Sequence, residues 1–308
     1  MPLTNSRLRV PAIALLGALL CALAFSSVAE AAKTKSTYSG LRVVDGKGRV
    51  LAEQTQYTGA PLSVKTDPKA TCFGPDDGGS GAKVEIPSPT ALSLLADAGA
   101  TTKSVKPLSI TDAFSFGLGL CGIGKAISPD TGFWSLKLNH EASMSGGDST
   151  AVKPGDEVLW YLVNDFNDPP PAELVLKTKK AKNGEVPVTV YAYDDAGKKT
   201  PAVGAGVVGA DGVTDKKGKT VVSADDKVVD IAATLDGTIP SNEVSVCTVK
   251  ASKCPAGYAG TVAGTKGNDK IKVDTPVTVL CGPGKDTVTV TGAVKIKAKG
   301  CEKVQGVA

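Results

Sequence analysis

Residue types that could support catalysis are sparse in this sequence. The only histidine is His140, so a Ser-His-Asp or Cys-His arrangement would have to include it. No G-x-S-x-G turn for a serine nucleophile and no H-E-x-x-H zinc helix occurs. We therefore expect a protein that is not an enzyme.

Gly117 to Gly122 has the spacing G-x-G-x-x-G, which holds phosphate groups in dinucleotide-binding proteins. Such a loop needs a helix N-terminus directly after its glycines, because the free N–H groups there bind the anion. The next residues include Gly124, Pro129 and Gly132, which interrupt a helix. The spacing therefore indicates a structural segment.

Three pairs of adjacent aspartates offer carboxylates for acid–base work or metal binding: Asp76-Asp77, Asp194-Asp195 and Asp225-Asp226. Each pair lies beside Gly, Lys or Ala in turn-like sequence, where carboxylates usually bond backbone amides or face water. We expect them to be turn residues.

The first 31 residues have the features of a secretion signal. Arg7 and Arg9 precede the apolar run Val10 to Phe25, and Ala29-Glu30-Ala31 provides small residues for cleavage. We expect a secreted, extracellular protein that either diffuses freely or stays at the cell surface. No later run approaches the roughly 20 apolar residues of a membrane span, so the mature chain should have no transmembrane segment.

Apart from Cys21 in this leader, six cysteines remain, an even number that indicates disulfides in an exported chain. Fifteen pairings are formally available. The grouping of the cysteines along the chain favours three local pairs, Cys72 with Cys121, Cys247 with Cys254, and Cys281 with Cys301. A zinc site is disfavoured, since no Cys-x-x-Cys occurs and there is one histidine.

Length and composition predict two or three domains with mainly β structure. The chain has 308 residues with 35 Gly and 19 Pro, and only 5% of it is aromatic, which favours small cores of Val, Ala and Thr. The net charge of +4 is spread thinly and no basic helix is present, so we expect neither nucleic acid nor an anionic membrane as partner. We expect a monomer.

The aromatic stretch from Phe133 to Val163 predicts two strands. Apolar and polar residues alternate from Trp134 to Asn139, the pattern of a strand with one buried face. Val158 to Val163 is continuously apolar, which predicts a central strand. Before it, Lys153-Pro154-Gly155-Asp156 has Pro and Gly at the centre of a type II turn.

This stretch resembles the transcobalamin C-terminal-like β-grasp domain of bacterial surface proteins. The matching residues are Trp134, Leu138, Asn139, Gly155, Asp156 and Trp160. The resemblance covers about residues 37–163 and implies a ligand site at the hairpin tip, formed by Trp134, Asn139 and His140, with a corrinoid-like ligand by analogy only. His140 replaces the family's usual Gly, so we expect a wider loop than the two-residue Asn-Gly turn.

A β-grasp also needs one helix packed across its mixed sheet. Thr90 to Ala98 has leucines at helical spacing, with Ser88 as the expected cap, Pro89 in the first turn and Gly99 at the end. We assign this domain to residues 36–169, ending at the triple proline Pro169 to Pro171, which cannot join a central strand.

Residues 172–250 predict an Ig-like β-sandwich. Short β-rich runs separated by Asp/Gly turns are found at Glu173 to Lys179, Val186 to Tyr193, Gly204 to Val208, Lys219 to Ser223, Val228 to Thr234 and Glu243 to Val249. The turn Thr214 to Gly218 is similar to that of bacterial Ig-like or carboxypeptidase-regulatory-like modules.

Residues 254–308 resemble a degenerate, short β-roll of calcium-binding nonapeptide repeats, G-G-x-G-x-D-x-U-x. Asp269 and Asp286 occupy the Asp position and are 17 residues apart, so they can stack on one edge and hold at most one calcium ion weakly. The alternative is a fold without calcium. No other cofactor is expected.

Taken together, these features predict a secreted, non-enzymatic binding protein whose β-grasp domain binds a small molecule or a surface partner. The alternative is a structural or adhesive cell-surface protein with an Ig-like spacer and a terminal repeat module. Nothing in the sequence names the ligand.

Overall fold

The computed structural model describes residues 36–72, 74 and 76–306. The expected secretion signal, residues 1–31, lies outside this range. The described chain is mainly β, as predicted, with a single α-helix and two short 3-10 turns among its strands. No helix in this range is long and apolar enough to cross a membrane.

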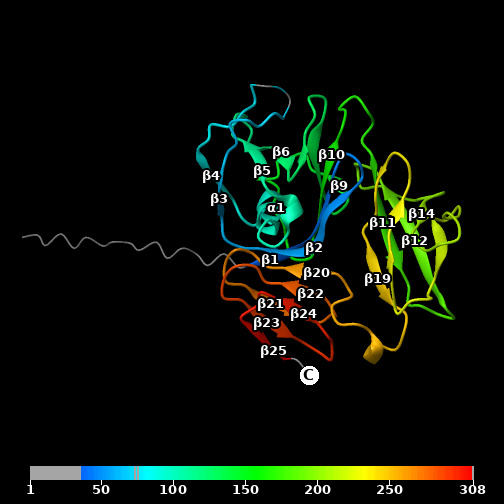
Figure 1. Cartoon of the computed structure of the whole chain (residues 1–308). Helices are drawn as coiled ribbons and strands as arrows, with labels where there is room; N and C mark the ends of the chain where they lie inside the picture. Colours follow the sequence, from blue (N-terminus) through cyan, green and yellow to red (C-terminus); the bar gives the residue numbers. More distant parts are fainter. Residues whose placement is uncertain (1–35, 73, 75, 307–308) are drawn as a thin grey trace, which may run out of the picture. The chain divides into compact units, whose positions relative to one another are not determined.

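A mixed sheet with a helix across one face forms the first part of the chain (Figure 1). Its strand order is β2-β1-β10-β8-β9, with β1 and β10 parallel and the other neighbours antiparallel. The strands are β1 (Thr37–Val44), β2 (Val50–Thr58), β8 (Phe133–Leu138), β9 (Glu141–Ala142) and β10 (Glu157–Val163). The continuous apolar run is thus the inner strand β10, as its sequence predicts.

Helix α1 (Ala91–Ala98) buries its leucines against this sheet. Its cap is Thr90 and not Ser88, a correction of two residues. The Thr90 hydroxyl accepts the N–H of Ser93 and the Ser93 hydroxyl accepts the N–H of Thr90, so the two residues form a capping box. Trp160 is 3% exposed and its indole N–H donates to the carbonyl of Ala91, which fixes the helix over β10.

The hairpin tip is a two-residue turn, so the expectation of a wider loop was wrong. Asn139 and His140 have φ of 53° and 73°, and Leu138 pairs with Glu141 directly. His140 therefore adopts the left-handed conformation that Gly would take. Its side-chain contacts, described below, offset the conformational free energy that a positive φ costs a residue with a side chain. Gly155 has φ of 84°, as the predicted type II turn requires.

Two small sheets cover the helix side: β3 (Leu62–Lys65) with β4 (Lys83–Ile86), and β5 (Leu108–Thr111) with β6 (Gly119–Ile123) and β7 (Ala126–Ile127). The short turn η1 (Lys103–Val105) precedes β5. The G-x-G-x-x-G stretch enters strand β6, which agrees with its structural interpretation. Cys121 on β6 forms a disulfide with Cys72.

The second part of the chain consists of short strands around a separate core of Val, Leu, Ile and Ala. The strands are β11 (Ala172–Thr178), β12 (Glu185–Tyr193), β13 (Lys199–Pro201), β14 (Gly206–Val207), β15 (Lys219–Ser223), β16 (Val228–Ile231), β17 (Ala233–Thr234), β18 (Thr238–Ile239) and β19 (Val244–Cys247). They pair antiparallel except for the parallel pair β11 and β18. Two of the strands, β13 and β18, are not predicted from the sequence. Cys247 and Cys254 form a disulfide around the turn η2 (Ala251–Lys253).

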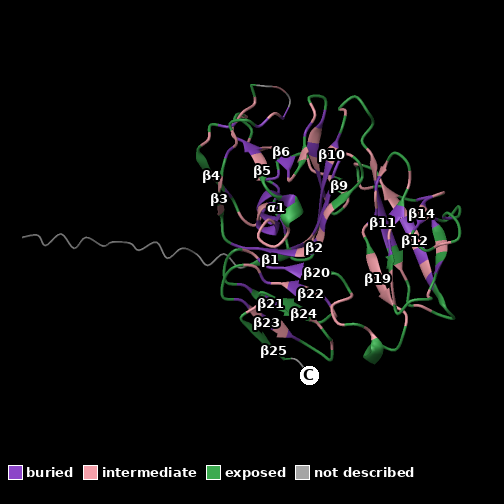
Figure 2. Cartoon of the chain, in the orientation of Figure 1, coloured by how far each residue is buried: buried purple, intermediate pink, exposed green. Residues whose placement is uncertain are grey.

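The last part, which we call the C-terminal roll, alternates between two parallel sheets. Strands β20 (Thr261–Ala263), β22 (Thr278–Leu280) and β24 (Lys297–Lys299) form one side, and β21 (Lys270–Val273), β23 (Thr287–Val290) and β25 (Lys303–Gln305) form the other. A core of valines and Ile271 lies between them (Figure 2). The Cys281–Cys301 disulfide joins its last two turns of chain, so all three disulfides are the local pairs that the sequence favours.

The C-terminal roll continues the sheet of the first part. Strand β20 pairs in parallel with β2, through Thr55 opposite Val262 and Gln56 opposite Ala263. The Gln56 amide also donates to the carbonyl of Gly264 at 2.9 Å. One eight-stranded sheet thus runs from β24 to β9.

Candidate functional site

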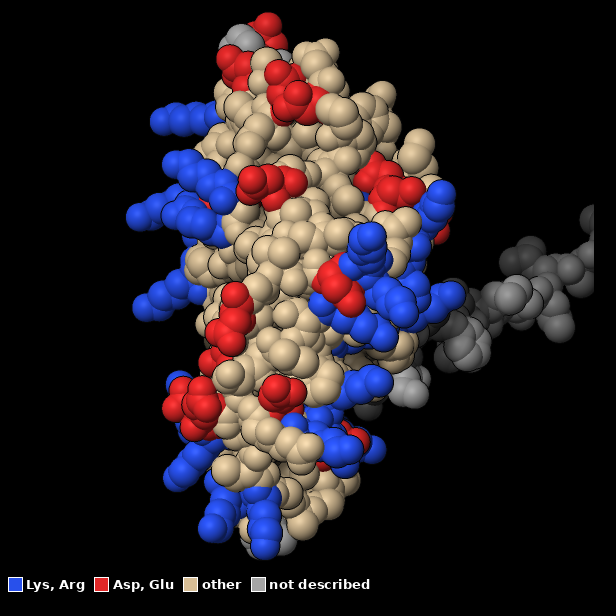
Figure 3. Space-filling model, turned by 90° about the vertical axis from the view of Figure 1, so that its right-hand side faces the viewer, with Lys and Arg blue, Asp and Glu red and all other residues tan. Residues whose placement is uncertain are grey.

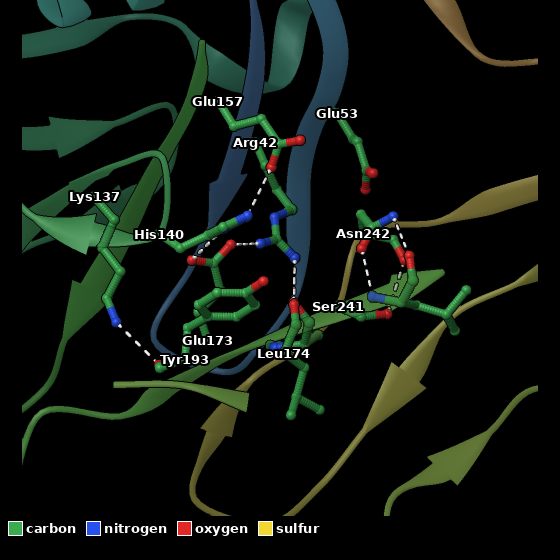
Figure 4. A network of polar contacts seen from close by, with 12 residues as sticks. Arg42, Glu53, Lys137, His140, Glu157, Glu173, Leu174, Tyr193, Ser241 and Asn242 are labelled. Carbon is green, nitrogen blue, oxygen red and sulfur yellow. Dashed lines mark hydrogen bonds and ion pairs between the residues drawn. The ribbon is translucent and has the colours of Figure 1, made fainter. Parts of the chain in front are cut away.

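His140 points away from the hairpin tip into a network of charged side chains (Figure 4). Its Nδ1 lies 3.2 Å from Glu173 Oε2, and its Nε2 lies 3.4 Å from Glu157 Oε2. The imidazole also lies against the Tyr193 ring, with 4.2 Å between ring centroids. The side chain is only 18% exposed, so this residue of the hairpin tip is largely covered.

Glu173 is the centre of this network. It begins the apolar part of β11, is 2% exposed, and forms an ion pair with Arg42 on β1. Arg42 also donates to the backbone carbonyls of Leu174 (3.3 Å) and Pro240 (2.6 Å). The guanidinium therefore has three acceptors in a site that is nearly closed to water, which offsets the cost of burying its charge.

A second buried cation lies beside the first. Lys137 on β8 has no exposed surface, and its Nζ lies 2.9 Å from Asp195 Oδ1 and 3.5 Å from the Tyr193 carbonyl. Asp194 accepts backbone N–H groups of its own turn, as predicted, but Asp195 is an ion-pair partner and not simply a turn residue. Both buried cations thus join the first sheet to the second part of the chain.

A cavity of about 430 Å³, which we call the central cavity, opens beside this network. Its walls come from β1, β2 and β10, from β11 and residues 242–243, and from residues 259–262, 275 and 277 of the C-terminal region. The ionisable residues that line it are Arg42, Glu53, His140, Glu157, Glu173, Lys177 and Glu243. Acidic side chains therefore outnumber basic ones in its wall.

Glu53 on β2 has the most unusual environment of these residues. Burial, together with the nearby carboxylates of Glu243 and Glu157, raises the pKa of its carboxyl to about 7, against the opposing effects of Arg42 and of the hydrogen bond from the Glu243 N–H. Its Oε1 accepts the backbone N–H of Glu243 at 2.9 Å. The cavity thus contains a carboxyl that exchanges its proton near neutral pH.

Of the three residues expected to bind a ligand, His140 lines the central cavity. Trp134 is 7% exposed and belongs to the core beneath α1. Asn139 is exposed, but its amide bridges the hairpin to the next turn, donating to Asp156 Oδ1 at 3.0 Å and accepting the N–H of Glu157 at 2.9 Å. Asn139 therefore holds the turn together.

Sequence reasoning missed Arg42, Glu53 and Glu173. Arg42 stands alone among apolar residues in β1, and Glu173 lies at the start of the apolar run of β11, which are weak signals of paired charges. The two residues are 131 positions apart, so no spacing along the chain relates them. A lone charge in an apolar strand was the one clue available.

Asp269 and Asp286 stack on one edge of the C-terminal roll, with Glu302 following in the last turn. Asp286 Oδ1 accepts the backbone N–H of Asp269 at 2.7 Å, and Glu302 Oε2 accepts that of Asp286 at 2.6 Å. Both carboxylate oxygens of Asp269 accept hydrogen bonds from Thr265. Burial raises the pKa of both aspartates. The carboxylates thus form a ladder that ties successive turns of chain.

As a calcium site, the ladder offers few donor atoms. Asp286 Oδ2 is buried without a hydrogen-bond partner, so one carboxylate oxygen is free to bind a cation. Within the part of the chain that the structure describes, no group of three or more Asp, Glu, His or Cys side chains is placed to hold a metal. The donor set is thin compared with the six to eight oxygens that calcium prefers.

Comparison with known proteins gives little further guidance. No family model matches the chain, and no curated protein matches it. Among solved structures, it is similar to a crystal structure of haptocorrin in complex with Cbi, at 12% sequence identity and a TM-score of 0.29. The similarity covers 43% of this chain and spans 26% of the haptocorrin chain. A similarity this weak assigns neither a family nor a ligand.

Proposed function

We propose that this protein is a secreted, non-enzymatic binding protein that holds a small organic ligand in the central cavity. The observation that carries the proposal is the cavity itself, about 430 Å³ in volume and lined by all three parts of the chain. Ligand sites are commonly of this size and lie where structural units meet. Apolar residues such as Leu41, Val158 and Val277 line it together with the charged groups.

The charges in the wall favour a ligand with a basic or hydrogen-bond-donating group. Arg42 is already neutralised by Glu173. The remaining charged residues in the wall include three acids, Glu53, Glu157 and Glu243, and one lysine, Lys177. The raised pKa of Glu53 means that its negative charge lacks adequate solvation in the cavity. An amine or amide placed beside Glu53 would supply that solvation and bind favourably.

The resemblance to transcobalamin C-terminal-like domains makes a corrinoid the first compound to test. A corrinoid ring is much larger than the central cavity, so it would insert only a side group. We therefore propose a smaller ligand. His140, the member of the hairpin tip that reaches the cavity, would contact it beside Glu157.

Secretion is proposed from the leader-like sequence of residues 1–31, and three disulfides are compatible with an oxidising compartment. Expression with the leader intact, followed by mass spectrometry of the exported chain, tests this part. A mature chain that begins shortly after Ala31 supports it. Retention of the whole leader in the cytoplasm contradicts it.

We also propose that the C-terminal roll binds at most one calcium ion, weakly, through Asp286 Oδ2 and glycine carbonyls. The ladder stabilises the roll without the ion, since Asp286 Oδ1, Glu302 Oε2 and Asp269 Oδ2 already accept backbone N–H groups. Calorimetric titration of the full chain tests this proposal. Absence of heat at millimolar calcium, or a signal unchanged in Asp286→Asn, would show that no calcium ion binds at Asp286.

A thermal-shift screen of the purified chain tests ligand binding. The library should contain amines, amides and a corrinoid, and a ligand at 100 times its Kd stabilises the folded state by about 2.7 kcal/mol. A ligand found in the screen should no longer raise the melting temperature of Glu53→Gln. It should still raise that of Glu85→Gln, a matched change at an exposed residue of β4. For the corrinoid, absorbance retained after gel filtration is a direct readout.

The alternative, a structural or adhesive surface protein, has one observation in its favour. The continuous sheet from β24 to β9 and the two buried cation pairs join the parts of the chain without a free linker. Retention on cell-wall material, together with no hit in the ligand screen, would favour this role over ligand capture.

A further inference from the structure

The outer surface of β21, β23 and β25 is a regular array of polar side chains. These strands are parallel and in register, with Lys270, Thr287 and Lys303 in one row and Lys272, Thr289 and Gln305 in the next. The alternate residues Ile271, Val273, Val288 and Val290 are buried in the core of the roll. Because side chains alternate across a strand, the six residues of the two rows share the outer face, which we call the roll face.

The roll face carries positive charge, and neither of its two rows contains an acidic side chain. Lys270, Lys272 and Lys303 are exposed, and no ion pair between described residues includes them. Lys285, in the turn before β23, is also exposed, and its backbone N–H donates to the side chain of Asn268 in the preceding turn. Asp274 is an exposed acid that follows β21 at one end of the face.

The acidic residues that directly precede these strands already take part in other hydrogen bonds. Asp269 and Asp286 are buried at 4% and 1% exposure, and the Glu302 carboxylate accepts the N–H of Asp286. They act within the carboxylate ladder and so do not pair with the lysine ammonium groups. Figure 3 shows both signs interspersed over most of one side of the molecule, whereas its lowest part carries projecting basic side chains.

The spacing of the array follows from sheet geometry. Lys270 and Lys303 are two strand spacings apart, or roughly 10 Å, while Lys270 and Lys272 are two residues apart on one strand, or roughly 7 Å. Thr287 lies between Lys270 and Lys303. In the next row, Thr289 lies between Lys272 and Gln305, and Gln305 Nε2 donates to Thr289 Oγ1 at 3.2 Å. The face therefore offers cations at regular intervals, separated by small hydrogen-bonding groups.

We propose that the roll face binds an acidic polysaccharide, with the lysines contacting its carboxylates and the threonines and Gln305 contacting its hydroxyls. The distance between Lys270 and Lys303 is about the length of a disaccharide unit in an extended chain. The six residues include no aromatic ring on which nucleic acid bases could stack and no apolar residue that could enter a lipid layer. This inference does not depend on the central cavity.

Binding of the full chain to immobilised polygalacturonate at low and physiological salt tests the proposal. The test variant is Lys270→Ala/Lys272→Ala/Lys303→Ala. The matched control is Lys179→Ala/Lys180→Ala/Lys182→Ala, which removes the same charge from exposed residues of the second part of the chain. We expect at least a tenfold loss of affinity in the test variant, a loss below twofold in the control, and affinity that falls with salt.

A Lys→Arg triple variant at the same positions should retain binding, and all variants should melt within a few degrees of the parent because the changed side chains are exposed. Equal losses in test and control variants would overturn the proposal, as would the absence of binding at low salt. Equal binding to neutral dextran, or tighter binding of this face to single-stranded DNA or to anionic lipid vesicles, would also overturn it.

Discussion

Replacing Glu173 by Gln should destabilise the protein far more than the loss of an ordinary surface charge. The substitution keeps the shape of the side chain but leaves the Arg42 guanidinium, whose side chain is 9% exposed, without its counter-charge. Breaking a buried pair by removing one partner generally costs about 3 to 5 kcal/mol. Because Arg42 retains the carbonyls of Leu174 and Pro240 as acceptors, we expect a loss near 3 kcal/mol.

Urea unfolding followed by tryptophan fluorescence provides the assay, since Trp134 and Trp160 both lie in the first core. The variant Arg49→Met is the control, because Arg49 pairs with Asp45 while 69% of its own side chain is exposed. That change should cost below about 1 kcal/mol. The double variant Arg42→Met/Glu173→Gln should recover stability relative to Glu173→Gln, because the unpaired buried charge is gone.

The reasoning fails if Glu173→Gln costs no more than Arg49→Met. It also fails if the double variant is less stable than Glu173→Gln, since Arg42 would then stabilise the fold without any help from the carboxylate. Either outcome would mean that water reaches the Arg42 site and screens its charge.

Three further predictions concern other parts of the chain. The pKa of Glu53 is raised from 4.5 to about 7, so its contribution to folding stability is present below pH 4.5 and is lost as pH rises through 7; Glu53→Gln should abolish that part of the pH dependence of the urea midpoint. Removing the Cys72–Cys121 bond, which closes 49 positions, should cost about 4 kcal/mol by loop entropy, measured by unfolding of the double Ser variant. Trp160→Ala should cost about 3 to 5 kcal/mol, whereas His140→Ala, which leaves Glu173 paired with Arg42, should cost about 1 kcal/mol; equal melting temperatures would contradict this.

Local signals in the sequence predicted most of the first sheet. The alternation from Trp134 to Asn139, the apolar run of β10 and the Pro-Gly turn before it correspond to observed elements. The helix was predicted too, but its cap was placed at Ser88. The observed cap is Thr90, whose reciprocal hydrogen bonds with Ser93 form the capping box.

Contacts between distant segments could not be predicted. The Gly and Asp spacing indicated a roll at the C-terminus, but nothing in Thr55 or Gln56 shows that this roll continues the first sheet through β2 and β20. The same applies to the candidate site, where Arg42 meets Glu173 across 131 residues. Of the residues in the candidate site, His140 alone was predicted, because the resemblance placed a ligand site at its hairpin tip.

The central claim, that the central cavity holds a ligand beside Glu53, is tested most directly by calorimetric titration of one screening hit into three proteins. The parent and Glu85→Gln should bind with the same affinity, and Glu53→Gln should bind at least tenfold more weakly, with proton release from Glu53 on binding of a basic ligand near pH 7. Undiminished affinity in Glu53→Gln, or a basic ligand that binds without any proton release at that pH, would contradict the claim.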